Sequence, residues 1–362
     1  MGPLAARLPS HWVTRLHAAR SASQGNLPPI LLDCACEVAV ATAVARMIDV
    51  NVSVSSSASV TPPALPGVAE AINDPSVGRL SWYQDGPADG LTPQRPLLLL
   101  HSINAAASAY EMKPLYEHYR KQRPVYALDF PGYGFSDRSA RMYTPRLMTD
   151  AIHSLLAVIR RQPAALPVDA IALSLSCEFL ARAAAEDPAA FRSLAFVSPT
   201  GFNRLPLRQG APGSTRGLPR MLAVITRPAV GRRLFRLLTR RGVIRYFLRR
   251  TWGSKRIDEG LLDYDYLTTH VEGAEHAPLH FLSGFLFSGD SGTLYQELTQ
   301  PIWVVHGVRG DFVDYRGLRQ VAQRSNWTCE VMPTGALPHF EMAEEFVRRY
   351  DAWATRTEST PI

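Results

Sequence analysis

The sequence has few cysteines and no long apolar run, and each of these shortages excludes a class of protein. No segment holds 18 consecutive apolar residues, so we expect no transmembrane helix. The four cysteines, Cys34, Cys36, Cys177 and Cys329, include no CxxC pair and show no zinc-site spacing with histidines. This pattern favours a reducing compartment. A redox pair formed by Cys34 and Cys36 is the less favoured alternative.

Acidic residues are missing from two segments. The first 32 residues contain no Asp or Glu, but they include Arg7, Arg15 and Arg20. Because no apolar core of signal-peptide length follows, we expect an N-terminal extension rather than a secretory signal, with a transit-like leader as the alternative. Residues 204–256 contain 15 Lys and Arg and no acid, whereas the whole chain has a net charge of +7. The rest of the chain therefore sums to about −8, and the basic character is local.

From about residue 77, short apolar runs alternate with helical segments. The runs cover residues 79–83, 96–101, 125–130, 168–174, 193–198, 301–306 and 329–332, and the helical segments cover 108–120, 144–161, 177–185, 315–324 and 341–356. Such apolar strands are typical of a parallel sheet covered on both faces, and the alternation predicts an α/β, doubly wound sheet with its ligand site at the carboxyl ends of the strands. We expect residues 76–200 and 300–357 to form this core, 1–75 an extension and linker, and 201–299 a helical, Arg-rich cap.

Ser174 lies where an apolar run changes at once into a helical segment. A sharp strand-to-helix turn lifts the hydroxyl of its middle residue out of the sheet, and it needs small residues two positions before and after. Here the turn reads Ala172-Leu173-Ser174-Leu175-Ser176, with Ala and Ser in place of the glycines of the pattern G-x-S-x-G. Taken alone, a serine at this position is more often a helix cap than a nucleophile.

The order of three residues along the chain strengthens the hypothesis of a nucleophile. Asp311 follows a late strand and a glycine turn, and His339 follows the last strand. A serine hydroxyl becomes a good nucleophile when a base takes its proton, and the base needs an acid that holds its tautomer. The order Ser, Asp, His therefore predicts a catalytic triad of Ser174, Asp311 and His339, with Asp314 as the rival acid.

With these motifs, the chain from about residue 77 to residue 353 resembles the α/β-hydrolase superfamily. The segment Asp129-Phe-Pro-Gly-Tyr-Gly-Phe-Ser136 is similar to the D-x-P-G-x-G-x-S loop of its esterase-like and C–C-hydrolase-like members. Leu100-His101-Ser102-Ile103-Asn104 stands where the family has an H-G-x loop. The resemblance implies an oxyanion hole made by the backbone N–H groups of Ile103 and Leu175, which would stabilise negative charge on a carbonyl oxygen.

The chain departs from the family pattern at positions around the predicted site. Ser102 replaces the usual glycine before the oxyanion donor, Gly310 occupies the commonest acid position, and Pro338 precedes the histidine where glycine is usual. None of these departures removes a reacting group. His101 and His306 each end an apolar run, and we expect them to be packing or supporting residues rather than bases.

The basic segment predicts an amphipathic cap. Between residues 230 and 250, apolar side chains at helical spacing lie opposite arginines. We expect Phe247 on the apolar face and Ser102 of the oxyanion loop to contact the substrate. Asn104 of the same loop is expected either to contact the substrate or to orient the oxyanion loop. The arginines are expected to be solvated or to contact an anionic membrane surface. Nucleic acid is not an expected partner, because no recognition motif accompanies the charge.

These features predict a serine hydrolase without a cofactor or metal, which acts on a carboxylic ester with a lipophilic acyl or aromatic group through an acyl-enzyme on Ser174. C–C bond hydrolysis or acyl transfer by the same residues is an alternative, because fold does not determine substrate. An alternative of another class is a non-catalytic α/β-hydrolase-like protein that binds a ligand or a membrane. We expect a cytoplasmic location, with membrane association through the cap as a variant of it.

Overall fold

One eight-stranded sheet organises the described part of the chain. The computed structural model describes residues 61–87, 94–162, 165–203, 210–309 and 313–358. The strands are β1 (Val68–Asp74), β2 (Gly78–Asp85), β3 (Leu97–Leu100), β4 (Val125–Asp129), β5 (Val168–Leu173), β6 (Phe191–Val197), β7 (Ile302–His306) and β8 (Trp327–Val331), in the order β1-β2-β4-β3-β5-β6-β7-β8. β2 is antiparallel to β1 and β4, and every other adjacent pair is parallel. The predicted α/β fold with a mostly parallel sheet is confirmed.

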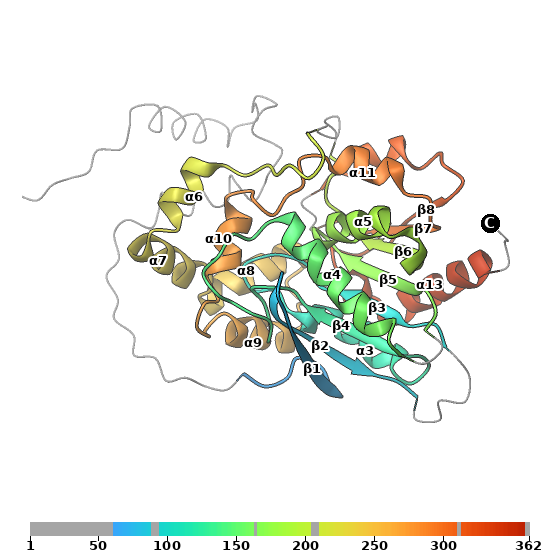
Figure 1. The fold of residues 1–362 in the computed structure, drawn as a ribbon, viewed down its shortest axis with the longest axis horizontal. Coiled ribbons are helices and arrows are strands. Elements are labelled where there is room, and N and C mark those ends of the chain that lie inside the picture. The colour runs from blue at the N-terminus through green and yellow to red at the C-terminus, as the bar shows by residue number, and fades with distance from the viewer. Residues whose placement is uncertain (1–60, 88–93, 163–164, 204–209, 310–312, 359–362) are drawn as a thin grey trace, which may run out of the picture. The chain divides into compact units, whose positions relative to one another are not determined.

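Helices cover both faces of the sheet, as the apolar strands require. All four leucines of β3 are buried: Leu98 and Leu100 belong to one core, and Leu97 and Leu99 belong to the other. This division follows from the alternation of side chains along a strand. The helices α4 (Pro145–Ile159), α5 (Ser176–Glu186) and α11 (Ser291–Glu297) pack on the first face, and α3 (Lys113–Tyr119) and α13 (Ala343–Glu358) on the second (Figure 1).

The N-terminal boundary of the core differs from the one expected. Residues 68–74, which the sequence placed in the extension, form β1. Asp74 stabilises the hairpin turn between β1 and β2, because its carboxylate accepts hydrogen bonds from the backbone N–H groups of Ser76 at 2.8 Å and Val77 at 3.3 Å. The core therefore begins before residue 76. Residues 1–60, including Cys34 and Cys36, lie outside the described residues.

The C-terminal segments also differ in detail from the prediction. In place of the helix expected over residues 315–324, a short 3₁₀ helix, η5, spans Arg316–Gln320. The helical segment expected to begin at residue 341 is preceded by a separate turn of helix, α12 (Pro338–Glu341), which carries His339. The predicted histidine therefore lies on a helical turn and not in a loop.

Helices dominate the segment between β6 and β7. They are α6 (Pro219–Ile225), α7 (Pro228–Leu238), α8 (Arg241–Trp252), α9 (Glu259–Thr268) and α10 (His276–Leu282), which lie together on the left of Figure 1, followed by α11. Among the described residues, no helix is long and apolar enough to cross a membrane. Two of these helices contact segments that follow the strands: α9 packs on the turn after β3, and the backbone N–H of Ala336, after β8, donates to the carbonyl of Thr251 on α8 at 2.8 Å.

Two buried side chains of α5 hold both ends of this segment. The carboxylate of Glu178 accepts hydrogen bonds from the hydroxyl of Thr200 at 2.6 Å and from the backbone N–H of Ser288 at 2.7 Å. One turn further along α5, Arg182 forms an ion pair with Asp290 at 2.6 Å. Since α5 begins directly after Ser174, the helical segment is anchored to the element that follows the predicted nucleophile.

Candidate active site

Ser174 occupies a strained turn between β5 and α5. Its φ is 58°, in the left-handed region that L-residues rarely adopt, although it is not a glycine. Its backbone N–H donates to the carbonyl of Val197 at 2.8 Å, and its side chain is partly exposed while Leu173 and Leu175 on either side are buried. Strain of about 1–3 kcal/mol persists only where surrounding structure imposes it, and it concentrates at functional sites.

Ser176, which stands at a glycine position of the elbow pattern, is fully buried. Its hydroxyl donates a hydrogen bond to the carbonyl of His101, at the end of β3. The serine therefore ties the start of α5 to the loop that was predicted to carry the oxyanion donor.

The loop after β3 is held by a buried carboxylate. Glu111, on the 3₁₀ helix η3 (Ala109–Met112), accepts hydrogen bonds from the backbone N–H of Ser102 at 2.7 Å, the hydroxyl of Ser102 at 2.9 Å and the amide of Asn104 at 2.9 Å. By contrast, the backbone N–H groups of Ile103 and Leu175 donate to no other described residue. The two predicted oxyanion donors are thus left unpaired within the described ranges, whereas Ser102 and Asn104, predicted to contact substrate, are engaged by Glu111.

His101 is a buried connector between two loops. The backbone N–H of Phe130 donates to its Nε2 at 3.1 Å, so Nε2 is the unprotonated nitrogen and Nδ1 donates to the carbonyl of Ser102 at 2.6 Å. Burial lowers the pKa of His101 to about 3. A neutral imidazole with both nitrogens bonded to the backbone is a structural group here.

The D-x-P-G-x-G-x-S segment is a compact loop built on Asp129. The buried carboxylate accepts hydrogen bonds from the backbone N–H groups of Ala109 at 3.1 Å and Phe135 at 3.0 Å. Gly134 has a φ of 49°, and a Cβ there would lie within about 2 Å of that carboxylate, so glycine is required. Asp129 therefore fixes both this loop and the start of η3, where Glu111 lies. Burial raises its pKa.

His339 is fully buried and bonded to Glu111, not to Ser174. Its Nε2 lies 2.8 Å from the backbone carbonyl of Glu111, and its Nδ1 has no hydrogen-bond partner among the described residues. Because a carbonyl only accepts, Nε2 carries the proton and Nδ1 is unprotonated in a neutral imidazole. Burial lowers the pKa of His339 to about 4, despite the opposing hydrogen bond. The structure therefore places a neutral imidazole beside η3, which holds the loop after β3, without joining it to Ser174 by a hydrogen bond.

Of the two candidate acids for the triad, the structure describes only Asp314. Asp311 lies outside the described residues. Asp314 is exposed; its carboxylate accepts a hydrogen bond from the backbone N–H of Arg316 at 3.1 Å and lies 4.0 Å from the guanidinium of the same residue. The structure gives Asp314 no hydrogen bond to His339.

Phe247 and His306 complete the predicted set. Phe247 lies on α8 and is partly buried; its ring packs edge-on against that of Tyr246, with centroids 5.4 Å apart. His306 stacks on Tyr315 at 3.8 Å, and its Nδ1 bonds the carbonyl of Gly307 at 2.8 Å.

Two buried acids beside the site were not predicted from the sequence. Glu111 and Asp265, on α9, are both at most 5% exposed, and α9 packs on η3 with Tyr264 stacked on Tyr110 at 5.1 Å. Burial raises the pKa of Glu111 to about 7, and burial together with the charge of Glu111 raises the pKa of Asp265 further above its ordinary value. One oxygen of Asp265 has no hydrogen-bond partner among the described residues. The sequence offered one sign of Glu111: it is a single acidic residue seven positions after Asn104, in the segment that follows the predicted oxyanion loop.

The sheet order and the sharp turn between β5 and α5 are those of the α/β-hydrolase fold. The model of the alpha/beta hydrolase family matches residues 97–349, and the chain belongs to this family. It is an α/β-fold hydrolase. A sequence comparison with curated proteins finds no match.

Solved structures of similar fold have low sequence identity to the chain. A serine hydrolase involved in carbazole degradation is 13% identical, with a TM-score of 0.59 over 80% of this chain and 98% of that one. The carboxylesterase CesB from Bacillus subtilis is 17% identical, with a TM-score of 0.57 over 80% and 93%. A putative lipase from Acinetobacter baumannii is 16% identical, with a TM-score of 0.60 over 81% and 92%. At these identities the likeness shows the fold alone.

Proposed function

We propose that the protein hydrolyses carboxylic esters with Ser174 as nucleophile, His339 as base and Asp311 as the acid that supports His339. The observation that carries the proposal is the left-handed φ of 58° at Ser174, between β5 and α5. A non-glycine residue held in this conformation at a strand-to-helix turn presents its side chain above the sheet. Esterases and a lipase among the structures of similar fold agree with an ester substrate.

The reaction follows from the residues around this turn. Ser174 Oγ attacks the ester carbonyl carbon while His339 takes its proton, and the N–H groups of Ile103 and Leu175 bind the oxyanion. The alcohol leaves with the proton from His339, which gives an acyl-enzyme. A water molecule then gives a proton to His339 and attacks the acyl carbon, which releases the acid and restores the Ser174 hydroxyl.

This reaction requires a rearrangement of His339. In the structure, the proton is on Nε2 and is donated to the carbonyl of Glu111. A base for Ser174 needs an unprotonated nitrogen toward the hydroxyl and a protonated one toward the acid. The imidazole must therefore leave Glu111 and change tautomer when substrate enters; catalytic hydrogen bonds often form only in the substrate complex.

A fluorophosphonate probe, which reacts with activated serines, tests the proposal. We expect the wild type to be labelled and Ser174→Ala not to be. Ser198→Ala is a matched control, because Ser198 also has a left-handed φ, 47°, at the end of a neighbouring strand, but its hydroxyl is buried and donates to the carbonyl of Ala336 at 2.8 Å. Labelling that survives Ser174→Ala would place the reactive serine elsewhere in the chain, and absence of labelling from the wild type would favour a non-catalytic binding protein.

Ester specificity is tested with p-nitrophenyl esters of increasing acyl length. If the substrate is a lipophilic ester, kcat/KM should rise with chain length. A 1,3-diketone substrate and an alcohol acceptor, assayed beside the esters, separate C–C hydrolysis and acyl transfer from ester hydrolysis. A larger kcat/KM for the diketone than for every ester would replace the proposed reaction with C–C cleavage.

We also propose that the outer face of α6 to α8 contacts an anionic membrane surface. Of the 34 residues from 219 to 252, ten are arginine and none is acidic. Helices α7 and α8 bury their apolar stripes and leave most of their arginines outward, and α7 contacts both α6 and α8. Three of these arginines, Arg232, Arg241 and Arg245, pair with Glu275, Asp263 and Glu259. Four of the nine exposed large hydrophobic side chains of the described residues lie between residues 218 and 246, namely Leu218, Val224, Val230 and Tyr246. Apolar side chains set among arginines fit the interface of an anionic bilayer.

Co-sedimentation with phosphatidylglycerol and phosphatidylcholine vesicles tests this contact. We expect binding to the anionic vesicles at low salt and its loss at high salt. At about 1 kcal/mol per arginine near an anionic surface, the triple variant of Arg232, Arg233 and Arg236 to Gln should bind about 100-fold more weakly. A triple variant of Arg316, Arg319 and Arg348 to Gln, which removes the same charge elsewhere, should bind like the wild type. Equal losses of vesicle binding in both variants would mean that binding depends on the net charge of the protein and not on the face of α6 to α8.

A further inference from the structure

Glu111 contacts both halves of the proposed catalytic apparatus. Its carboxylate accepts three hydrogen bonds from the loop that carries Ile103, two of them from Ser102 and one from Asn104. Its backbone carbonyl accepts the Nε2 proton of His339. The side chain is 5% exposed, so these bonds are shielded from water.

The bonds from Ser102 decide which backbone N–H of the loop is available to a ligand. The N–H of Ser102 points at Glu111, and the next N–H, that of Ile103, has no partner among the described residues. Loss of the carboxylate would leave the buried N–H and O–H donors of Ser102 without an acceptor, and the loop would turn to satisfy them. The orientation of the Ile103 donor therefore depends on Glu111.

We propose that Glu111 is a positioning residue, which holds the oxyanion loop through its carboxylate and the resting His339 through its carbonyl. The inference rests on the ester hydrolase function proposed above. The carboxylate works best when ionised, because it then accepts three hydrogen bonds without a proton of its own. Binding of substrate would break only the His339 bond, and the loop would stay in place.

Three titratable groups act on or contact Glu111. They are Asp265 on α9, Tyr133 in the loop after β4 and His339 on α12. The elements β3, β4, α3 and α9 pack on η3, and His101, Asp129 and Lys113 lie at the ends of β3 and β4 and at the start of α3. The same burial that raises the pKa of Glu111 to about 7 lowers that of His339 to about 4. The two ionisations are therefore separated and can be resolved in a pH profile.

The experiment compares wild type, Glu111→Gln and Glu111→Ala on the best p-nitrophenyl ester between pH 4 and 9. In the wild type, kcat/KM, which reports the free enzyme, should rise as pH increases through about 7, as Glu111 ionises, in addition to a limb near pH 4 from His339. Glu111→Gln keeps an acceptor oxygen, so it should retain activity within about tenfold but lose the step near pH 7. Glu111→Ala should lose about 10²–10³-fold in kcat with little change in KM, as expected for a misplaced oxyanion donor.

Glu178→Gln is the matched control, because Glu178 is an equally buried glutamate with two hydrogen bonds and no contact with the oxyanion loop. It should keep the pH step. Hydrogen exchange of residues 101–107 gives a readout without activity: protection should fall in Glu111→Ala and not in Glu178→Gln. An unchanged pH step in Glu111→Gln, or unchanged protection in Glu111→Ala, would overturn the inference. Failure of the proposed function would appear differently, as a wild type that no fluorophosphonate labels.

Discussion

At the scale of single residues, the backbone strain at Ser174 has a measurable cost. A left-handed conformation costs an L-residue about 1–2 kcal/mol, and glycine avoids most of it at an entropic cost of about 0.5–1 kcal/mol. We expect Ser174→Gly to abolish ester turnover and to raise the free energy of unfolding by roughly 0.5–1 kcal/mol. Ser174→Ala removes the same hydroxyl but keeps the Cβ, so its stability should match the wild type in urea titrations. Equal stability of the two variants would mean that the strain at the turn is no larger than the entropic cost of glycine.

The identity of the triad acid is a second question at this scale. Asp314 is exposed and bonded to Arg316, whereas His339 has a buried nitrogen without a described partner. We therefore expect Asp311→Asn to lower kcat by about 10⁴-fold, the effect of a wrong base tautomer, and Asp314→Asn to change it less than about threefold. Initial rates of p-nitrophenyl ester hydrolysis measure both. The reverse order of effects would assign the acid to Asp314.

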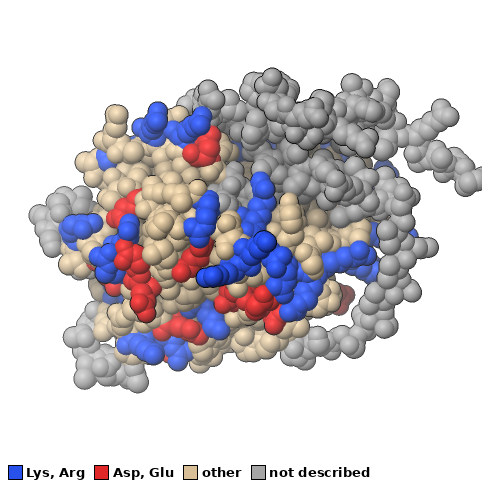
Figure 2. Space-filling model, turned by 180° about the vertical axis from the view of Figure 1, so that it is seen from behind, with Lys and Arg blue, Asp and Glu red and all other residues tan. Residues whose placement is uncertain are grey.

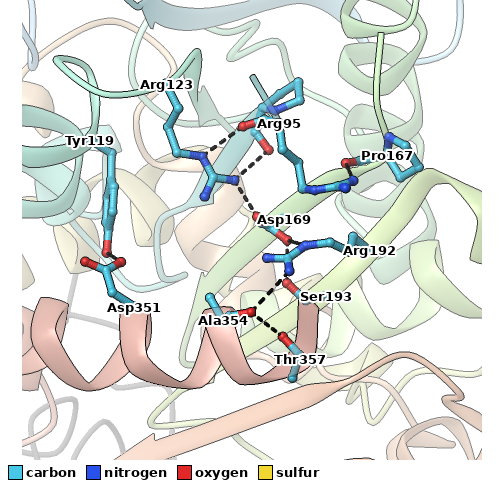
Figure 3. Close-up of polar contacts among 11 residues, drawn as sticks. Arg95, Tyr119, Arg123, Pro167, Asp169, Arg192, Ser193, Asp351, Ala354 and Thr357 are labelled. Carbon is cyan, nitrogen blue, oxygen red and sulfur yellow. Dashed lines mark hydrogen bonds and ion pairs between the residues drawn. The ribbon is translucent and has the colours of Figure 1, made fainter. Parts of the chain in front are cut away.

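At the scale of elements, a buried ion cluster joins strands and helices through the start of β5 (Figure 3). Asp169 accepts hydrogen bonds from Arg123, Arg192 and Ser193, each at 2.5 Å, and its side chain is 1% exposed. Burial alone would raise the pKa of Asp169, but the arginines outweigh it and lower the pKa. Arg192 also reaches the carbonyl of Ala354 on α13.

Removal of the Asp169 charge leaves two arginines without their common partner. Loss of one member of a buried pair costs about 3–5 kcal/mol, so Asp169→Asn should lower the free energy of unfolding by that amount. Glu186→Gln is the control: its pair with Arg146 is more than a third exposed on both sides and should contribute at most about 1 kcal/mol. Urea titrations compare the two. A cost below 1 kcal/mol for Asp169→Asn would mean that the cluster is no tighter than a surface pair.

Elements buried on both faces could be predicted from the sequence, and exposed or irregular ones could not. The leucines of β3 are apolar throughout because the strand lies between two helical layers. β1 is an edge strand that is exposed or half-exposed along its length, so no apolar run marks it. The contact of Glu111 with Ser102 joins two irregular segments, so no periodic pattern in the sequence could predict it. The order of Ser174, Asp311 and His339 along the chain could be recognised in the sequence. The hydrogen bond between His339 and the carbonyl of Glu111 could not be predicted from it.

At the scale of the whole molecule, charges of the two signs are distributed unevenly along the chain. Residues 204–256 hold 15 of the 39 Lys and Arg, and no acid. On the face drawn in Figure 2, by contrast, basic and acidic side chains lie intermixed. Mixed charges of this kind contribute little to specificity, whereas a segment of one sign favours an anionic partner.

Buried histidines and a buried glutamate change the free energy of unfolding in opposite directions as the pH falls. The pKa of His101 is lowered to about 3 from 6.5, so the unfolded chain takes up the proton first, and this contribution to stability is lost as pH falls below about 6.5. The pKa of Glu111 is raised to about 7 from 4.5, so the folded chain takes up the proton first, and this contribution grows as pH falls from 7 to 4.5. The lowered pKa of His339 likewise makes the folded state less stable as pH falls below about 6.5.

Two variants separate these contributions. The free energy of unfolding of the wild type, relative to His101→Gln, should decrease between pH 7 and 4.5, because the variant has no imidazole to protonate in the unfolded state. Relative to Glu111→Gln, the wild type should become more stable over the same range, because the variant lacks the carboxylate that is costly to bury at pH 7. Urea titrations at pH 7, 5.5 and 4.5 measure both differences. If they changed in the same direction, at least one of the two buried groups would titrate as it does in water, and the burial that isolates the oxyanion loop would be absent in solution.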